Sequence, residues 1–413
     1  MKKIRKIVKI VKFLFYFVKI FFTKLINSFF LIKVLTNKKF SKKLIVCVQC
    51  SEFGSMVAST KFILDLLNEK KIQISNVIFL FPKKIINNQF FFFLKKNFKV
   101  LKHEKIFNIF FYSFNLFQDK IIRYKLTNGY VNLERSTYQF IFSNKQIDMV
   151  QEIFYKLNIN PKQKIVCLSN RDNFFYDTVE KKHKDFNNYR NSHFSKFGKS
   201  INFLINSNYT PIRVGHYDNE KGYNQIRGTM DLTKKEKEIF DLYLNTTCEF
   251  AVVPSSGLAW VPHLFDKPTL MHNLIPYGES PSVNNGIMIP KLIKSIVSNE
   301  IINIKNLLNM WSIKLQEPNL NDARPFFCTS ADKLQSDHDY KKFSLYTEEN
   351  SEEEIFMAMK EIIHYVIKKQ KLSKENKDLQ IRFKLAFPFH HPLRNTKALI
   401  SPFWLKKYFK FLI

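Results

Sequence analysis

The segment from Glu249 to Asn273 constrains the fold more than any other part of the chain. Its first apolar run, Phe250 to Val253, has the length and composition of a buried strand and ends at Pro254. A Ser-Ser-Gly turn follows, then an apolar helix from Leu258, a Lys-Pro turn and a second apolar strand. Strand, helix and strand in this order predict a βαβ unit of a parallel sheet, and therefore an α/β fold.

The turn between this strand and its helix has the features of an anion site. The first backbone N–H groups of a helix have no partner within the helix, and the helix dipole adds positive potential there. Ser255, Ser256 and Gly257 would add two hydroxyls and a close backbone approach. Ligands bind beyond the carboxyl ends of strands in such folds, so we expect a phosphate or diphosphate here. The alternative is an ordinary helix with Ser255 or Ser256 as its N-cap.

A second strand, turn and helix begin the first domain. Leu44 to Val48 is an apolar strand, Gly54 lies in the turn after it, and a helix with apolar spacing runs from Met56 to Asn68. A further buried strand, Ile74 to Phe81, indicates a parallel sheet in this part of the chain. One glycine is far from a dinucleotide-binding fingerprint, so a plain tight turn is the alternative to a ligand-binding role for Gly54.

The chain of 413 residues is too long for one hydrophobic core and suits two domains of roughly 150 to 200 residues each. The turn from Asn158 to Lys162 separates them, and the alternation of strands and helices resumes at Ile165. We therefore expect an α/β protein with two Rossmann-like domains. The predicted parts are a basic amphipathic helix (1–35), an N-terminal domain (40–155), a C-terminal domain (160–370) and a tail that packs back (371–413).

The N-terminal segment mixes basic and apolar residues with helical spacing. At ~100° per residue all its basic residues except Lys3 fall within ~140° of one face, and the other face is apolar. Its longest uncharged stretch, Leu25 to Ile32, is far shorter than the ~20 residues of a membrane-spanning helix. With a net charge of +31, this pattern predicts a helix lying on an anionic membrane surface. The alternatives are a signal peptide, although an uninterrupted apolar core is missing, and a core helix with a solvated lysine face.

Five ordered motifs extend the argument beyond the fold. They are Val166-Cys-Leu-x-x-Arg171-Asp172, Tyr189-Arg-Asn191, Pro211-Ile-Arg213-Val-Gly215, Pro254-Ser-Ser-Gly257 and Asn273-x-x-Pro276-x-Gly278. Together they resemble a family of glycosyltransferases encoded in bacterial surface-polysaccharide and lipopolysaccharide loci. The Ser-Ser-Gly segment also resembles the nucleotide-sugar loop of heptosyltransferases and related two-domain (GT-B) enzymes. The similarity covers mainly residues 160–300, and Ser169 stands where the family pattern has His.

The resemblance implies transfer of a sugar from a nucleotide-sugar donor to a lipid-linked or cell-surface polysaccharide acceptor. Such a reaction needs cations or N–H donors at the departing diphosphate and a base at the acceptor hydroxyl. The candidates are Arg213, Ser255, Ser256, Gly257 and Gly54 for the donor, Asp172 as base with Arg171 beside it, and Tyr189, Arg190 and Asn191 for the acceptor. A structural ion pair is the alternative for Arg171 and Asp172, and helix capping is the alternative for the Tyr-Arg-Asn motif.

We expect neither a metal nor another cofactor, because Asp337-His-Asp339 falls in a charged, loop-like stretch and the nucleotide sugar is itself a substrate. The five cysteines lie mostly in apolar runs, which predicts buried free thiols in a reducing compartment. These features favour a cytoplasmic enzyme, peripheral on the inner face of the membrane. Two other functions stay open, a nucleotide-sugar epimerase on the same fold and a basic nucleic-acid-binding protein. No nucleic-acid-reading motif is present, so we expect no nucleic-acid partner.

Overall fold

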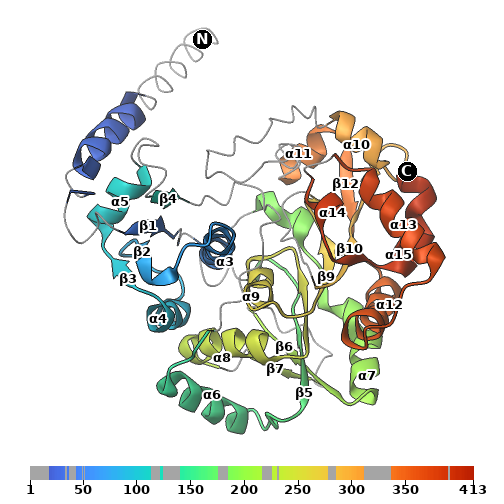
Figure 1. Cartoon of the computed structure of the whole chain (residues 1–413). Helices are drawn as coiled ribbons and strands as arrows, with labels where there is room; N and C mark the ends of the chain where they lie inside the picture. Colours follow the sequence, from blue (N-terminus) through green and yellow to red (C-terminus); the bar gives the residue numbers. More distant parts are fainter. Residues whose placement is uncertain are drawn as a thin grey trace.

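The computed structural model describes most of the chain, and Figure 1 shows its two α/β parts. The described residues are 18–32, 35–36, 43–48, 50, 52–112, 121–123, 140–174, 185–215, 226–229, 232–277, 285–310, 336–388 and 391–413. Residues 1–17 of the predicted N-terminal helix, Cys328 and Gly278 lie outside them. The rest of that helix, residues 18–32, is helical as expected.

The first part contains a four-stranded parallel sheet in the order β3-β2-β1-β4. Its strands are β1 (Leu44–Cys47), β2 (Val77–Phe81), β3 (Val100–Lys102) and β4 (Ile121–Arg123). Its helices are α3 (Phe53–Glu69), α4 (Asn88–Asn97) and α5 (Glu104–Tyr112). The short helix η1 (Ile74–Asn76) leads into β2. The strand and the helix expected around Gly54 are therefore present as β1 and α3, and the helix already begins at Phe53.

The second part contains a seven-stranded parallel sheet in the order β13-β10-β9-β8-β5-β6-β7. Its strands are β5 (Lys164–Leu168), β6 (Tyr209–Arg213), β7 (Arg227–Gly228), β8 (Phe250–Pro254), β9 (Thr269–Leu274), β10 (Gly286–Pro290) and β13 (Leu399–Ile400). The helices around it are α6 (Asn144–Lys156), α7 (Gly198–Asn206), α8 (Lys234–Thr247), α9 (Trp260–Leu264) and α12 (Glu352–Glu361), with the short η3 (Asp185–Arg190), η4 (Phe194–Phe197), η5 (Gly257–Ala259) and η7 (Ile362–Ile367). Strands buried on both faces read as continuous apolar runs, which is why β5 and β8 were visible in the sequence.

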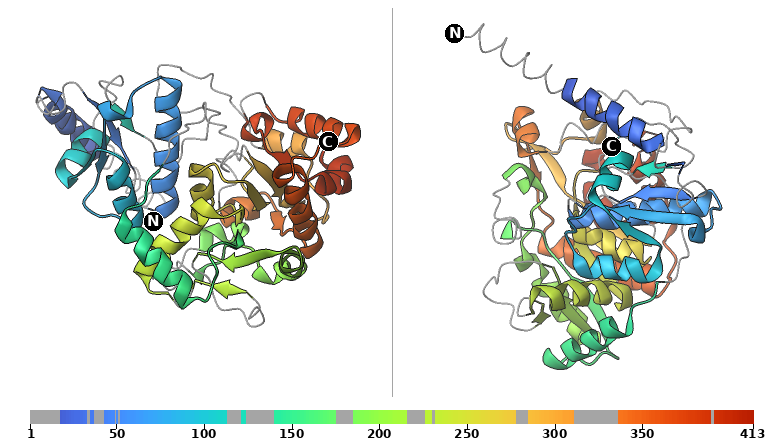
Figure 2. Two further views of the ribbon diagram at one scale, coloured as in Figure 1. Left: turned by 60° about the horizontal axis from the view of Figure 1, so that its bottom comes forward. Right: turned by 90° about the vertical axis from the view of Figure 1, so that its left-hand side faces the viewer.

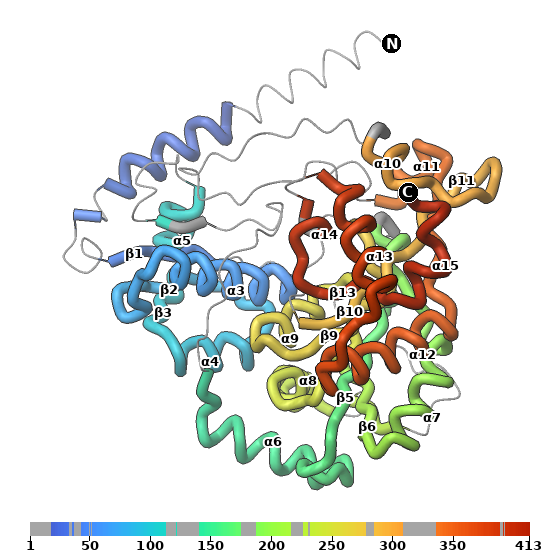
Figure 3. The backbone as a smooth tube through the Cα atoms, turned by 45° about the vertical axis from the view of Figure 1, so that its right-hand side comes forward, coloured from blue at the N-terminus to red at the C-terminus, as the bar shows by residue number. Residues whose placement is uncertain are grey.

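The C-terminal region belongs to the second part. Strand β13 pairs with β10 at the edge of the large sheet, and the Gln380 side chain donates to and accepts from the Ile400 backbone at 2.5 and 2.9 Å. The remaining elements are the antiparallel pair β11 (Leu292–Ser295) and β12 (Leu345–Glu348), and the helices α10 (Ile304–Met310), α11 (Asp337–Lys342), α13 (Lys374–Leu385), α14 (Pro392–Asn395) and α15 (Pro402–Leu412). Helix α15 packs on α12 and α13, on the opposite side of the molecule from the N-terminal helix (Figures 1 and 3).

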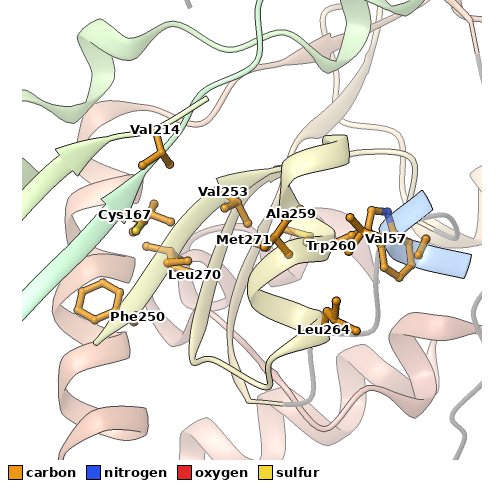
Figure 4. Close-up of a cluster of buried hydrophobic side chains, with 14 of the residues drawn as sticks. Val57, Cys167, Val214, Phe250, Val253, Ala259, Trp260, Leu264, Leu270 and Met271 are labelled. Atoms are coloured by element: carbon orange, nitrogen blue, oxygen red, sulfur yellow. The ribbon is translucent and has the colours of Figure 1, made fainter. Parts of the chain in front are cut away.

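One hydrophobic core runs through both parts. Helix α3 packs on η5 and α9, and α4 packs on α8, so that the first part lies against the helical layer of the second (Figure 2). Val57 of α3 joins the same buried cluster as Trp260 of α9 (Figure 4). Helix α3 is buried from Gly54 to Leu67, including an ion pair of 2.5 Å between Lys61 Nζ and Asp65 Oδ1. The two parts are therefore joined through an apolar interface.

Candidate functional site

The carboxyl ends of four neighbouring strands meet at one edge of the large sheet. Leu168 of β5 lies beside Arg213 of β6 on one side and beside Val252 of β8 on the other. Pro254, the last residue of β8, lies beside His272 of β9. The predicted donor and catalytic residues follow these strands, so the parallel register brings them together at a single edge, as the sequence motifs required.

The Ser-Ser-Gly turn follows β8 at this edge. Ser255 is buried, and its Oγ accepts a hydrogen bond of 3.1 Å from the backbone N–H of Ile275 after β9. Ser256 is the N-cap residue of η5, but its side chain makes no capping hydrogen bond. Ser255 thus fixes the neighbouring turn, and the side chain of Ser256 does not serve as an ordinary helix cap. The start of η5 is continuous with α9.

Gly54 of the first part touches Gly257 of the second, backbone against backbone. A Cβ atom at Gly54 would lie 2.5 Å from Gly257 Cα, and a Cβ at Gly257 would lie 3.0 Å from Gly54 N. Real Cβ atoms do not approach backbone so closely, and glycine alone lacks that atom. Gly54 lies within α3, so the plain tight turn considered from the sequence is wrong. The glycine permits contact between the two domains at the start of η5.

Arg213 is held at the end of β6 by two neighbours. Its guanidinium lies over the Phe194 ring at 3.9 Å from the ring centre, and its Nη2 donates to Asn170 Oδ1 at 3.1 Å. Only 4% of its surface is exposed. A cation so placed contributes positive potential to the sheet edge, and Asn170 connects it to the loop after β5.

Arg171 lies in that loop and binds the predicted acceptor motif. Its backbone N–H donates to Ser192 Oγ at 3.3 Å, and its Nη1 donates to Asn187 O at 2.9 Å and to the side-chain oxygen of Asn191. Arg171 is buried, with 8% of its surface exposed. The structure thus brings two motifs that are distant in the sequence into direct contact.

Lys291, which follows β10, supports the same motif and was missed in the sequence. It is buried, and its Nζ donates to Tyr189 O at 3.0 Å and to Asn191 O at 2.6 Å. The pKa of Lys291 is lowered to about 8, mainly by burial and in part by the nearby Arg171 charge, while the Glu349 and Asp337 carboxylates oppose the shift. The available signal was a lone lysine after the apolar run from Gly286 to Pro290.

The motif residues have different exposures. Tyr189 is buried, whereas Arg190 and Asn191 are half-buried, and Arg190 Nε lies 3.5 Å from Ile275 O. The backbone N–H of Tyr189 donates to Asp337 Oδ1 at 2.9 Å, and that of Asn188 donates to Asp337 Oδ2 at 2.6 Å. The sequence placed Asp337 in a solvated, loop-like charge run, and this was wrong. Asp337 begins α11, and its carboxylate anchors the motif.

Asp172, the predicted base, lies at the open end of the loop after β5 and is half-buried. Its Oδ1 accepts from the Phe174 backbone N–H at 3.1 Å, and its Oδ2 lies 3.4 Å from Asn170 Nδ2. Both carboxylate oxygens of Asp172 therefore accept a hydrogen bond from the same loop. A second carboxylate, that of Glu52, is exposed at the N-cap of α3, two residues before Gly54. No sequence pattern singled out Glu52, because only the tertiary contact between Gly54 and Gly257 brings it near the second domain.

His272 of β9 holds the loop after β5 in place by a hydrogen bond that passes over the intervening strand β8. Its Nε2 donates to Ser169 O at 2.9 Å, and its Nδ1 accepts from Asn273 Nδ2 at 2.9 Å. Burial lowers the pKa of His272 to about 4, so the ring is neutral near pH 7. Ser169, which stands where the family pattern has His, is therefore bonded through its carbonyl to a different histidine.

Three further findings bear on the sequence expectations. Among the described residues, no group of three His, Cys, Asp or Glu side chains is arranged to hold a metal ion. The four described cysteines, Cys47, Cys50, Cys167 and Cys248, are free and buried, as expected. None of the helices in the described ranges has the length and apolar character needed to cross a membrane.

No family model matches the chain, and no curated protein matches it. Among solved structures, it is similar to a glycosyl transferase family 9 protein from Veillonella parvula, with 10% identity, a TM-score of 0.45 and coverage of 78% of this chain and 97% of that one. It is also similar to the E. coli ADP-heptose LPS heptosyltransferase II, with 11% identity, a TM-score of 0.35 and coverage of 55% and 84%. A third similarity is to the wall teichoic acid polymerase TagF, with 11% identity, a TM-score of 0.27 and coverage of 63% and 80%. At this level of similarity, function has to be argued from the site itself.

Proposed function

We propose that this protein is a glycosyltransferase that moves a sugar from a nucleotide-sugar donor to a lipid-linked or cell-surface polysaccharide acceptor. The observation that carries the proposal is the contact of Gly54 with Gly257. It sets the first turn of α3 against the start of η5, beside the carboxyl edge of the large sheet. A site between two parallel α/β units can hold the donor on one unit and the acceptor on the other.

The donor side is the second sheet. Backbone N–H groups at the start of η5 and the hydroxyl of Ser256 can bind a diphosphate. The buried Arg213, which donates to Asn170, adds positive potential at the same edge of the sheet. Negative charge grows on the diphosphate as the glycosidic bond breaks, so fixed donors and cations stabilise the transition state more than the ground state. These groups take the place of a metal ion in the proposed mechanism.

The acceptor side involves the loop after β5 and the motif that it holds. Asp172 is the proposed base for the acceptor hydroxyl, because its carboxylate follows β5 at the carboxyl edge of the sheet and is only half-buried. Arg171 and Lys291 position Tyr189, Arg190 and Asn191 through the backbone and amide contacts described above. Nucleotide sugars are cytoplasmic substrates, so the proposed location is the cytoplasmic side of the membrane.

The proposal is tested by thermal unfolding of the purified chain with a panel of nucleoside diphosphates and nucleotide sugars, without added metal. A ligand at 100 times its dissociation constant should stabilise the folded state by about 2.7 kcal/mol. The variant Ser256→Ala should lose part of the shift while keeping the melting temperature of the free protein, because its side chain caps nothing. No shift with any nucleotide would rule out the donor site.

The base is tested separately in Asp172→Asn, with Glu52→Gln as the matched variant on the other domain. We expect Asp172→Asn to keep the nucleotide-induced shift but to lose turnover by roughly 10² to 10⁴ fold, the usual contribution of a general base. Normal turnover in Asp172→Asn together with a loss of turnover in Glu52→Gln would show that Glu52 of the first domain, and not Asp172, is the base.

A further inference from the structure

The N-terminal helix, residues 18–32, rests on the first domain by one side only. Ser28 and Leu31 are buried there, and Leu35 follows just beyond the helix. Leu31 and Leu35 join a small cluster on the face of the first sheet that is turned away from the second domain, together with Phe107 and Phe110 of α5. This side holds the helix in place (Figure 3).

The opposite side of the same helix is apolar and exposed. Its residues are between 45% and 72% exposed, and they are Val18, Phe21, Phe22, Leu25, Ile26, Phe29, Phe30 and Ile32. At ~100° per residue they fall within an arc of ~180°. The alternative considered from the sequence was a core helix with a solvated lysine face. Such a helix would bury this apolar arc against the protein. The structure turns it outward, and a contiguous exposed apolar face marks an interaction site.

The charges around this face select the partner. Lys19 lies at the margin of the apolar arc and Lys24 on the other side, both exposed. Six more basic residues stand in the sequence before the helix, at positions 2, 3, 5, 6, 9 and 12, and no acidic residue occurs before Glu52. A protein partner of ordinary composition carries both acidic and basic residues, and it would not require a segment that is basic throughout. An anionic phospholipid surface offers both an apolar layer and negative headgroups.

We infer that the exposed face of residues 18–32 inserts into an anionic leaflet with the helix axis parallel to the membrane. Aromatic rings enter the boundary between headgroups and acyl chains, while Lys19, at the margin of the apolar arc, extends to the phosphates. The first domain then faces the bilayer, since it carries the helix (Figure 1). Membrane binding is inferred from this exposed face and does not depend on the proposed function. That the helix brings the enzyme to a lipid-linked acceptor does rest on the proposed function.

The test is sedimentation of the full chain with vesicles of phosphatidylglycerol and phosphatidylcholine, compared with vesicles of phosphatidylcholine alone. We expect binding to the anionic vesicles that weakens with added salt. Phe22→Ser/Phe29→Ser should lower the partition constant at least tenfold without changing the melting temperature, since these side chains are 54% and 72% exposed. The matched control is Phe92→Ser/Tyr155→Ser, which removes two aromatics that are 52% and 91% exposed on other elements and should bind as the wild type does.

Two results would overturn the inference. The wild-type chain could stay in the supernatant with anionic vesicles, or the Phe22/Phe29 variant could bind them as well as the control does. A dimer that the same variant dissociates, without vesicle binding, would show that the face receives a second copy of the chain. The nucleotide-induced thermal shift is measured in the same samples, so loss of that shift with vesicle binding intact contradicts the proposed function alone.

Discussion

Gly54→Ala should loosen the contact between the two domains at η5 while both domains stay folded. The added Cβ would lie 2.5 Å from Gly257 Cα, whereas two carbon atoms pack best at about 3.5 to 4.0 Å. Both groups are attached directly to backbone, so an overlap of about 1 Å can be relieved only by moving α3 away from η5. Forcing a methyl group into a packed site costs about 1 to 3 kcal/mol.

Part of that cost is offset, because alanine in a helix is more stable than glycine by about 0.5 to 1 kcal/mol. We therefore expect a net loss of roughly 1 to 2 kcal/mol in urea unfolding, an unchanged far-UV circular dichroism spectrum and a reduced nucleotide-induced thermal shift. The matched control is Gly198→Ala at the start of α7. Its Cβ would meet only the end of the Glu352 side chain, at 2.9 Å, which can move away. Equal stability and equal nucleotide binding in Gly54→Ala and wild type would refute the reasoning.

Two further predictions use pH. The folded pKa of Lys291, about 8, lies below its ordinary value of 10.5, so stability should rise with pH between these values, and Lys291→Met should flatten that rise in urea unfolding at pH 7.5 and 9.5. The folded pKa of His272, about 4, lies below its ordinary 6.5, so stability should fall as pH drops from 6.5 towards 4, by up to about 3 kcal/mol for this group. His272→Gln should lose that part of the acid sensitivity, and an unchanged acid profile would contradict the assignment.

The sequence predicts the elements that build the donor side because their signals are local. Strands β5 and β8 are short apolar runs that end at Leu168 and Pro254, and parallel strands align their carboxyl ends. The motif order then places Arg213 and Ser255 at one edge, which the register confirms. The roles of these residues in binding and catalysis stay predictions.

Other features depend on contacts that no local pattern records. Lys291 and Asp337 come from distant parts of the chain, and each acts on the backbone of Tyr189. Strand β13 has only two residues, too few to show a period, and it exists because β10 offers an open edge. Gly54 is required by the other domain, so its sequence neighbours could only indicate a turn.

The shared core has a consequence for how this chain is made. In many two-domain proteins the first domain can fold as it leaves the ribosome and wait for the second. Here one side of α3 packs on η5 and α9 of the second domain, and Val57 lies in the same buried cluster as Trp260. Until the second half is synthesised, the side of α3 that packs on η5 and α9 has no partner and is open to solvent. We therefore expect the nascent chain to expose apolar surface until its second half has been made, which is the condition under which folding intermediates aggregate.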